Sequence, residues 1–239
     1  PLPLTGVADV PSAPLTRQKR ESMMRAWMLR RSGGPDVLEL TEVAEPTPGP
    51  GQVGVRVEAI GINYAEVLSR KGLYGWAPKR PYVPGLEAVG TVVAVGEGVD
   101  RERLGQRVLC GTKSGAYAEG LVVPAARALP TIPGFSLEEN AAYGVNFMTA
   151  WVSLVEMARI RPTDRVGVTA AAGGVGTAAV QIAVAHGCGV VGMAGSDEKL
   201  ELVAGLGASA TVNYRRPDFS SRLGAVARDG GLDVVVEVV

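Results

Sequence analysis

A glycine-rich turn between two apolar segments constrains the fold of this chain more than any other feature. The first apolar segment spans residues 166–170, and an Ala/Val/Ile-rich segment follows the turn and continues to Gly187. A second apolar run occupies residues 190–194. This order predicts a strand, a tight turn, a helix ending at Gly187 and a second strand. Together they form one βαβ unit of the dinucleotide-binding type.

Each glycine of the turn has a predicted physical task. Gly173 lets the chain turn, Gly174 admits a diphosphate to the backbone N–H groups, and Gly176 lets the helix lie close to the strand. Val175 belongs to the same phosphate-binding turn, and Ala170 replaces the first glycine of the usual pattern. The alternative is a glycine-rich turn that only permits helix–strand packing.

Composition excludes several classes of protein. The chain has 239 residues, of which 46% are hydrophobic and 20% charged, as in an ordinary globular protein. Its formal net charge is zero, which argues against nucleic-acid binding. Cys110 and Cys188 are far apart and form no metal or redox pair, so a reducing, cytoplasmic compartment is expected. No apolar run reaches the roughly 18–20 residues of a membrane span.

The two halves of the chain differ in pattern. Residues 1–22 are Pro-rich and are interpreted as a disordered tail. Short alternating segments separated by Gly/Pro turns then predict a small, partly closed β-barrel. Its expected strands lie near residues 25–29, 37–43, 53–63, 89–95, 107–110 and 117–123.

From residue 136 the periodicity changes. One helix is expected from about residue 137 to 160, and strands then alternate with helices. That alternation predicts an α/β fold with a doubly wound parallel sheet. The apolar run 233–239 stops without a turn, so we expect the chain to be cut in the middle of this sheet.

The order of these parts resembles the zinc-independent quinone oxidoreductases related to zeta-crystallin, within the medium-chain dehydrogenase/reductase superfamily and near the vesicle amine transport protein branch. The resemblance covers nearly the whole chain after the tail. The motifs that carry it are GGPDVLEL at 33–40, PGPGQVGVRVEAIGIN at 48–63, RKGLY at 70–74, PGLEAVGTVVAVGEGV at 84–99, GAYAEGLVVP at 115–124 and AAAGGVGTAAVQIA at 170–183.

The resemblance implies a GroES-like catalytic domain at residues 24–135 and an incomplete Rossmann NADP-binding domain at 136–239. Zinc-dependent relatives have Cys, His and Glu ligands where this chain reads GINYAEV and PGLEAVG. A zinc site needs three or four suitable donors, so no metal site is expected. His186 is instead expected in the last turn of the helix after the glycine turn, where it suits the helix dipole.

The resemblance also implies NADPH as the cofactor. No acid occupies the tip of the second strand of the βαβ unit, although two acids follow in the next helix. Ser196, Lys199 and Tyr214 match the family positions near the 2′-phosphate. The alternatives are a helix cap for Ser196, solvated surface for Lys199 and strand packing for Tyr214.

Candidate catalytic residues also come from the resemblance. Asn63 and Tyr74 match positions that face the nicotinamide and substrate, and Thr149 matches one near the carboxamide. Tyr64 is adjacent to Asn63 and could also point inward. Asn63 could instead only cap the helix that starts at Tyr64, and Asn146 could assist the cofactor or close a turn.

The leading hypothesis is an NADPH-dependent oxidoreductase that reduces quinones or α,β-unsaturated carbonyls by direct hydride transfer, without zinc. Its partner is a small-molecule substrate, and a homodimer is expected for the full-length protein. The alternative is an NADPH-binding interaction or structural protein with little catalytic activity. A third hypothesis is that a chain truncated in this way is inactive.

Overall fold

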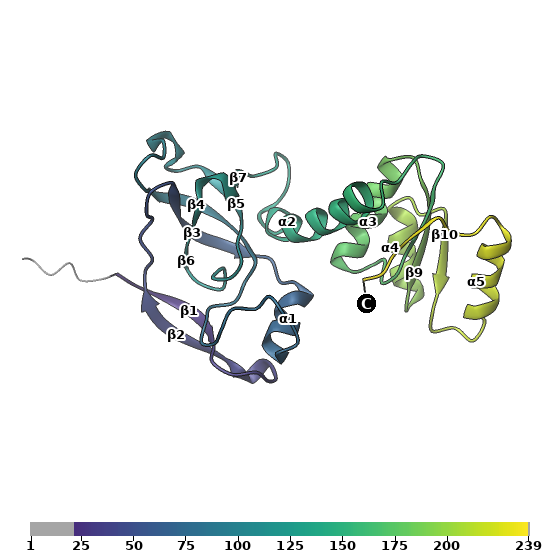
Figure 1. The fold of residues 1–239 in the computed structure, drawn as a ribbon, viewed down its shortest axis with the longest axis horizontal. Helices are drawn as coiled ribbons and strands as arrows, with labels where there is room; N and C mark the ends of the chain where they lie inside the picture. Colours follow the sequence, from purple (N-terminus) through teal and green to yellow (C-terminus); the bar gives the residue numbers. More distant parts are fainter. Residues whose placement is uncertain (1–21, 239) are drawn as a thin grey trace, which may run out of the picture.

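The protein has two lobes joined by one long helix (Figure 1). The computed structural model describes residues 22–238, so the predicted tail lies outside the described residues except for Ser22. The first lobe is rich in β-structure, and the second alternates strands with helices. Within the described residues no helix is long and apolar enough to cross a membrane.

The first lobe is built on a five-stranded antiparallel sheet in the order β6-β3-β4-β5-β7. The strands are β3 (Gln52–Ile60), β4 (Glu87–Val95), β5 (Arg107–Gly111), β6 (Gly120–Pro124) and β7 (Ala128–Pro130). Val53, Val55, Val92 and Val108 are fully buried in its core.

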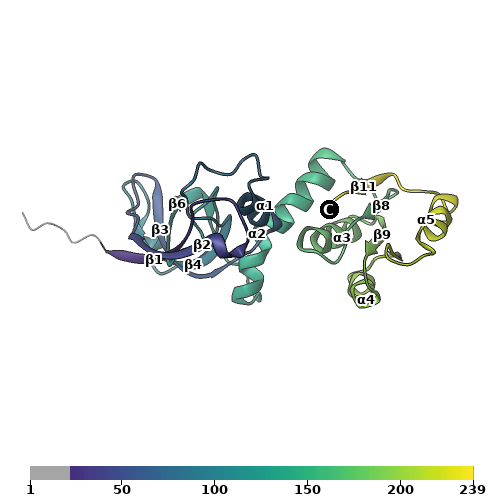
Figure 2. The same cartoon turned by 90° about the horizontal axis from the view of Figure 1, so that it is seen from below.

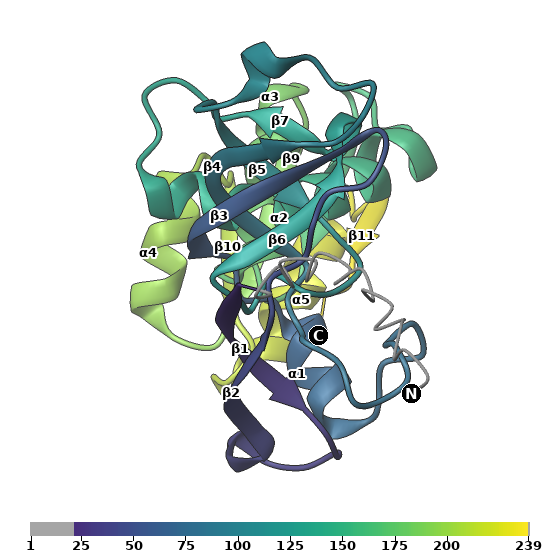
Figure 3. The same cartoon turned by 90° about the vertical axis from the view of Figure 1, so that its left-hand side faces the viewer.

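A two-stranded ribbon, β1 (Met23–Leu29) with β2 (Leu38–Ala44), extends the lobe below this sheet in Figure 3. Single bridges from Ala26 to Ala118 and from Leu29 to Tyr82 tie it to the rest of the lobe. Helix α1 (Tyr64–Lys71) follows β3, and three short 3₁₀ turns complete the lobe at η1 (Pro35–Val37), η2 (Arg101–Arg103) and η3 (Ala125–Arg127).

Helix α2 (Leu137–Trp151) connects the lobes, packing on β3, β4 and β5 at one side and on α3 (Gly174–Ala185) at the other. It begins with a capping box, in which Ser136 Oγ accepts the N–H of Glu139 and Glu139 accepts the N–H of Ser136. The single helix predicted for this region continues beyond α2 as a π-helical segment, η4 (Val152–Met157). Figure 2 shows this connection from below.

The second lobe contains a four-stranded parallel sheet in the order β10-β9-β8-β11. Its elements after η4 are β8 (Arg165–Val168), α3, β9 (Gly189–Ala194), α4 (Asp197–Gly205), β10 (Ala210–Asn213), α5 (Phe219–Arg228) and β11 (Val234–Val236).

Helices cover both faces of this sheet. Along β9, Val190 packs in the cluster that holds α3 and α4 side chains, including Val180 and Val203. Its neighbour Val191 packs in a separate cluster with Val226 of α5. Because successive strand residues point to opposite faces, α5 lies across the sheet from α3 and α4. The predicted doubly wound parallel sheet is therefore confirmed.

Several element boundaries differ from the sequence predictions. The strand predicted at 53–63 ends at Ile60, and the one predicted at 117–123 is shifted to Gly120–Pro124. The short β7 was not predicted, because its three residues are too few to show a pattern. The strand predicted at 166–170 ends at Val168, since Ala170 leaves the extended conformation with a φ of 41°.

Ala170 is the residue that turns the chain toward α3. Its carbonyl O accepts the N–H of Gly173 at 2.8 Å. The left-handed conformation costs a residue with a Cβ about 1–2 kcal/mol, a cost that glycine avoids. Ala170, which stands where the usual pattern has its first glycine, therefore has a strained backbone.

We predict that Ala170→Gly raises the free energy of unfolding by about 0.5–1 kcal/mol, since relief of this strain exceeds the added freedom of the unfolded chain. Urea denaturation measures the change. The matched control is Ala171→Gly, at a buried position whose φ is not positive, where we expect a loss of about 1 kcal/mol. Equal losses in both variants would contradict this account.

Candidate active site

Asn63 lies at the junction of β3 and α1, with 8% of its surface exposed. It is the N-cap residue of α1, with extended backbone, and its N–H donates to Glu66 Oε2 at 2.6 Å. Its side-chain Nδ2 donates to Glu87 Oε1 at 2.8 Å. The residue thus stands at the helix start, as one alternative held, while its amide is directed at a second buried group.

The Glu87 carboxylate joins three segments of the chain. It projects from β4, is 3% exposed, and its Oε2 accepts the N–H of Val145 in α2 at 2.7 Å. Gly61 leaves room for it, because a Cβ there would lie 2.3 Å from Glu87 Oε1 and 2.4 Å from the Ala141 carbonyl O. Burial raises the pKa of Glu87, while the hydrogen bonds from Asn63 and Val145 lower it.

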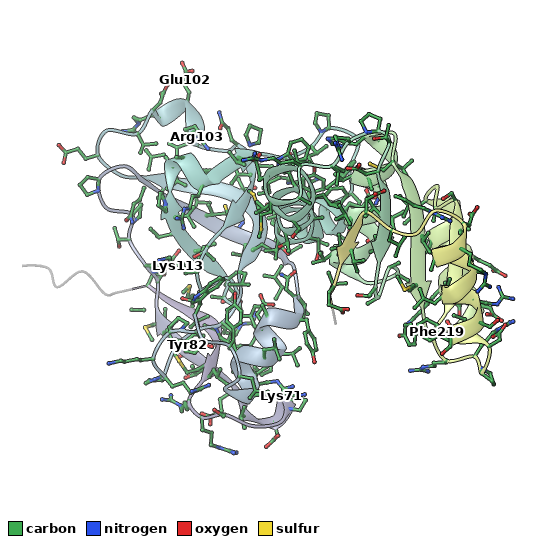
Figure 4. All side chains as sticks on the ribbon, turned by 45° about the vertical axis from the view of Figure 1, so that its right-hand side comes forward. Lys71, Tyr82, Glu102, Arg103, Lys113 and Phe219 are labelled. Carbon is green, nitrogen blue, oxygen red and sulfur yellow. The ribbon has the colours of Figure 1, made fainter. Side chains whose placement is uncertain are left out.

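A second buried carboxylate, Glu66, stabilises the same junction. Its Oε1 accepts the N–H of Leu86 at 3.0 Å, which ties α1 to the residue preceding β4. Burial raises the pKa of Glu66, and the negative charge of Glu87 raises it further. Two carboxylates, Glu66 and Glu87, therefore hold the start of α1 in place through their hydrogen bonds. Figure 4 labels Lys71, the last residue of this helix.

Asn146, which follows Val145 in α2, contacts the glycine turn. Asn146 Oδ1 lies 2.5 Å from where a Cβ on Gly174 would stand, so its side chain rests against the start of α3. Its Nδ2 donates to the Ala142 carbonyl O at 2.9 Å. Thr149 lies one turn further on, and its hydroxyl donates to the Val145 carbonyl O at 2.7 Å. Neighbouring positions of α2 thus link Glu87 to the turn.

The glycine turn presents an open helix N-terminus. Gly173 is the N-cap of α3 and offers no side chain to cap it, so the N–H groups of Gly174, Val175 and Gly176 lack intrahelical acceptors. A Cβ on Gly176 would lie 2.3 Å from the Ala170 carbonyl O. The helix therefore lies directly on the backbone of the turn, and its positive end is open to an anion.

The predicted 2′-phosphate residues gather at the neighbouring strand ends. Ser196 is the N-cap of α4, and its Oγ lies 3.4 Å from the N–H of Lys199. The Tyr214 hydroxyl would lie 2.8 Å from a Cβ on Gly195, so its ring covers the end of β9. Lys199 and Tyr214 are both exposed. The contact of the Tyr214 ring with Gly195 also fits the alternative of strand packing, so the role of Tyr214 at a 2′-phosphate stays a prediction.

The two candidate tyrosines lie apart from the carboxylate junction. Tyr64 is 66% exposed, and Tyr74 lies in the loop after α1, where its ring meets Trp76 edge-on with centroids 6.0 Å apart. Within residues 22–238 no hydrogen bond joins either phenol to Asn63. The structure therefore links Asn63 to the glycine turn through Glu87 and α2. The exposed Tyr64 and the half-buried Tyr74 lie outside this link.

Other polar residues have structural positions. His186 is the C-cap residue of α3, and its Nδ1 lies 2.9 Å from the Ile182 carbonyl O. Cys110 and Cys188 are buried and unpaired. Among the described residues, no group of three or more His, Cys, Asp and Glu side chains could hold a metal ion.

Sequence reasoning missed Glu66 and Glu87 as parts of this site. A signal existed for Glu87, because it is a lone acid at the head of the apolar run EAVGTVVAV, and such an acid is buried only with partners. Its partner Val145 offers a backbone group, which no sequence pattern reveals.

We predict a specific pH dependence for Glu87. Burial raises its folded-state pKa above the ordinary 4.5, so the folded protein holds the proton more tightly than the unfolded chain does. The carboxyl then contributes stability that is fully present below pH 4.5 and is lost as pH rises through the folded-state pKa. The free energy of unfolding of wild type minus that of Glu87→Gln should fall across this window, measured by urea denaturation. A difference that rises with pH would contradict the assignment.

Comparisons with known proteins agree with this architecture. The family model "Alcohol dehydrogenase GroES-like domain" matches residues 49–134, and "Zinc-binding dehydrogenase" matches residues 174–239. The chain is 38% identical over 221 residues to quinone oxidoreductase of Rattus norvegicus, covering 92% of this chain and 67% of the relative. It is 37% identical over 217 residues to the rat synaptic vesicle membrane protein VAT-1 homolog, covering 90% and 53%.

Among solved structures, the quinone oxidoreductase from Thermus thermophilus, described with its NADPH complex, matches with a TM-score of 0.78 and 40% identity. The match covers 90% of this chain and 66% of that one. The chain thus spans about two thirds of the quinone oxidoreductases and about half of the VAT-1 homolog. With a GroES-like lobe, a Rossmann lobe and these relatives, the chain belongs to the quinone oxidoreductase family of the medium-chain dehydrogenases/reductases.

Proposed function

We propose that this chain forms the cofactor- and substrate-binding part of an NADPH-dependent oxidoreductase that reduces quinones or α,β-unsaturated carbonyls without zinc. One observation carries the proposal. Glu87 binds both the Asn63 amide and the Val145 N–H, and the residue after Val145 touches the glycine turn. Helix α2 therefore contacts both the carboxylate that binds the candidate donor Asn63 and the glycine turn that is the candidate dinucleotide site.

The residues of the turn fit a dinucleotide diphosphate. The N–H groups of Gly174, Val175 and Gly176 would donate to it, and the α3 dipole would favour its charge. Ser196 would offer a hydroxyl, Lys199 a positive charge and Tyr214 a phenol to the 2′-phosphate. Thr149 would lie near the carboxamide. The relative from Thermus thermophilus, described in complex with NADPH, supports this choice of cofactor.

When bound, the nicotinamide supplies a hydride. The chain's part is to orient the acceptor and stabilise the negative charge that develops on its carbonyl oxygen. Asn63 has one amide hydrogen engaged with Glu87 and a second available to donate to that oxygen. Tyr64 and Tyr74 stay candidate donors to the same oxygen, although no hydrogen bond joins either phenol to Asn63 within the described residues.

Zinc independence rests on the donor set. Lewis-acid catalysis by zinc requires three protein ligands. Residues 22–238 contain no group of three His, Cys, Asp or Glu side chains that could hold a metal ion. Hydrogen bonding then has to stabilise the oxyanion. The domain division at residues 135–136, the homodimer and the cytoplasmic location stay predictions.

We predict that Asn63→Ser lowers kcat/KM for quinones about 10²–10³-fold, the usual effect of losing one oxyanion donor, while the Kd for NADPH stays within about twofold. Serine is chosen because it preserves a good N-cap for α1. The assay follows loss of NADPH absorbance across a panel of quinones and enones, alongside a thermal melt and titration of NADPH binding.

Two results would count against the proposal. An Asn63→Ser enzyme as active as wild type would remove the assigned role of the amide. Wild-type protein that binds NADPH but reduces no member of the panel would favour the alternative of an NADPH-binding interaction protein, for which the similarity to the VAT-1 homolog is the supporting observation.

A further inference from the structure

We propose that Arg216 and Asn213 determine cofactor choice by engaging the Asp197 carboxylate, which as a free acid would repel a 2′-phosphate and accept the ribose hydroxyls of NAD. The inference rests on the proposed function and deepens it, because it explains how an acid close to the strand end can coexist with a 2′-phosphate. Asp197 is the first residue of α4, three positions after the end of β9.

A free carboxylate at this place would oppose NADPH. Acids near the end of the second strand of a Rossmann unit accept the ribose hydroxyls of NAD, and they repel a 2′-phosphate. Judged by position alone, Asp197 would therefore favour NAD and counteract Lys199, which lies two residues further on.

The structure engages both oxygens of this carboxylate. Asn213 Nδ2 donates to Asp197 Oδ1 at 3.0 Å, and Arg216 Nη2 donates to Oδ2 at 2.5 Å. These two hydrogen bonds lower the pKa of Asp197, in that order of importance. The acid is thus ionised at neutral pH, but its charge is compensated and its lone pairs are directed at protein donors.

The sheet places both donors on one side of Asp197. Asn213 ends β10, and the sheet order β10-β9-β8-β11 places β10 and β8 on opposite sides of β9. Asp197 lines a cavity of about 280 Å³ together with Asn213, Arg216 and side chains of α4. The carboxylate is therefore turned toward the donors at the end of β10, so a 2′-phosphate beside Ser196, Lys199 and Tyr214 would meet an acid that is already paired.

Asn213 is itself fixed in place. It is 8% exposed, and its Oδ1 accepts the N–H of Arg215 at 3.0 Å, which orients the amide so that Nδ2 faces Asp197. The Arg216 carbonyl O accepts the N–H of Phe219 at the start of α5, labelled in Figure 4. The turn between β10 and α5 thus presents both donors from a defined backbone.

The test measures dissociation constants of NADP⁺ and NAD⁺ by isothermal titration calorimetry. Arg216→Gln removes the ion pair of Asp197 and leaves only the Asn213 hydrogen bond. We expect the Kd for NADP⁺ to rise about tenfold, with the Kd for NAD⁺ unchanged or lower. Adding Asp197→Asn to Arg216→Gln should restore the Kd for NADP⁺ to within about threefold of wild type. A thermal melt of each variant establishes that it is folded.

A matched double variant distinguishes the effect of the Asp197–Arg216 contact from the effect of the net charge of the protein. Arg216→Gln with Glu198→Gln also removes one positive and one negative charge, but it leaves Asp197 ionised and without its ion pair. We expect no recovery of NADP⁺ binding in this protein. Equal recovery in both double variants, or an Arg216→Gln protein with an unchanged ratio of dissociation constants, would overturn the inference.

The outcome is separable from failure of the proposed function. A wild-type protein that binds NADP⁺ no more tightly than NAD⁺ would contradict the proposed cofactor and this inference together. A wild type that prefers NADP⁺, with an Arg216→Gln variant that prefers it equally, would overturn the inference alone.

Discussion

The arrangement of the site depends on one buried carboxylate. Glu87 accepts hydrogen bonds from the Asn63 amide and from the Val145 backbone N–H, and these belong to the β-rich lobe and to the connecting helix. A buried charge is tolerated only when its oxygens are satisfied, so neither partner can move away without exposing it. The carboxylate therefore fixes the position of α2 on the first lobe, and α2 in turn carries Asn146 to the start of α3.

The glycine turn imposes the second constraint. Gly176 brings α3 against the backbone of the turn, and Ala170 accepts a left-handed conformation to make that approach possible. The result is an uncapped helix end beside β9, which Ser196 follows, with Tyr214 after the neighbouring strand β10. Backbone strain at Ala170 thus accompanies the short distance between strand and helix, while the N–H groups of α3 are open because Gly173 offers no capping side chain.

Periodicity and turn chemistry predicted the two-lobed α/β architecture, because strand alternation and the βαβ order are local properties of the sequence. Boundaries were predicted less well, since the end of β8 is set by the φ of Ala170 and the π-helical segment after Trp151 leaves no compositional trace. Asn63, Ser196 and Tyr214 could be proposed by resemblance, but the Glu87 and Asp197 contacts could not. Both pair a side chain with groups distant in sequence, so they follow from packing alone.

The central claim is that the N-terminus of α3 receives the diphosphate of NADPH, and Gly173→Val tests it most directly. Gly173 has an ordinary φ of −82°, and a Cβ there makes one close contact, 3.2 Å from the Ala170 carbonyl O. The φ angle therefore does not require glycine here, so the predicted task of turning the chain falls to Ala170 instead. The one close contact requires a shift of a few tenths of an ångström, whereas a side chain would obstruct the approach of a diphosphate. The account predicts that calorimetric titration finds NADPH affinity at least about tenfold weaker in a variant that melts within a few degrees of wild type. A well-folded variant that binds NADPH as tightly as wild type would contradict it.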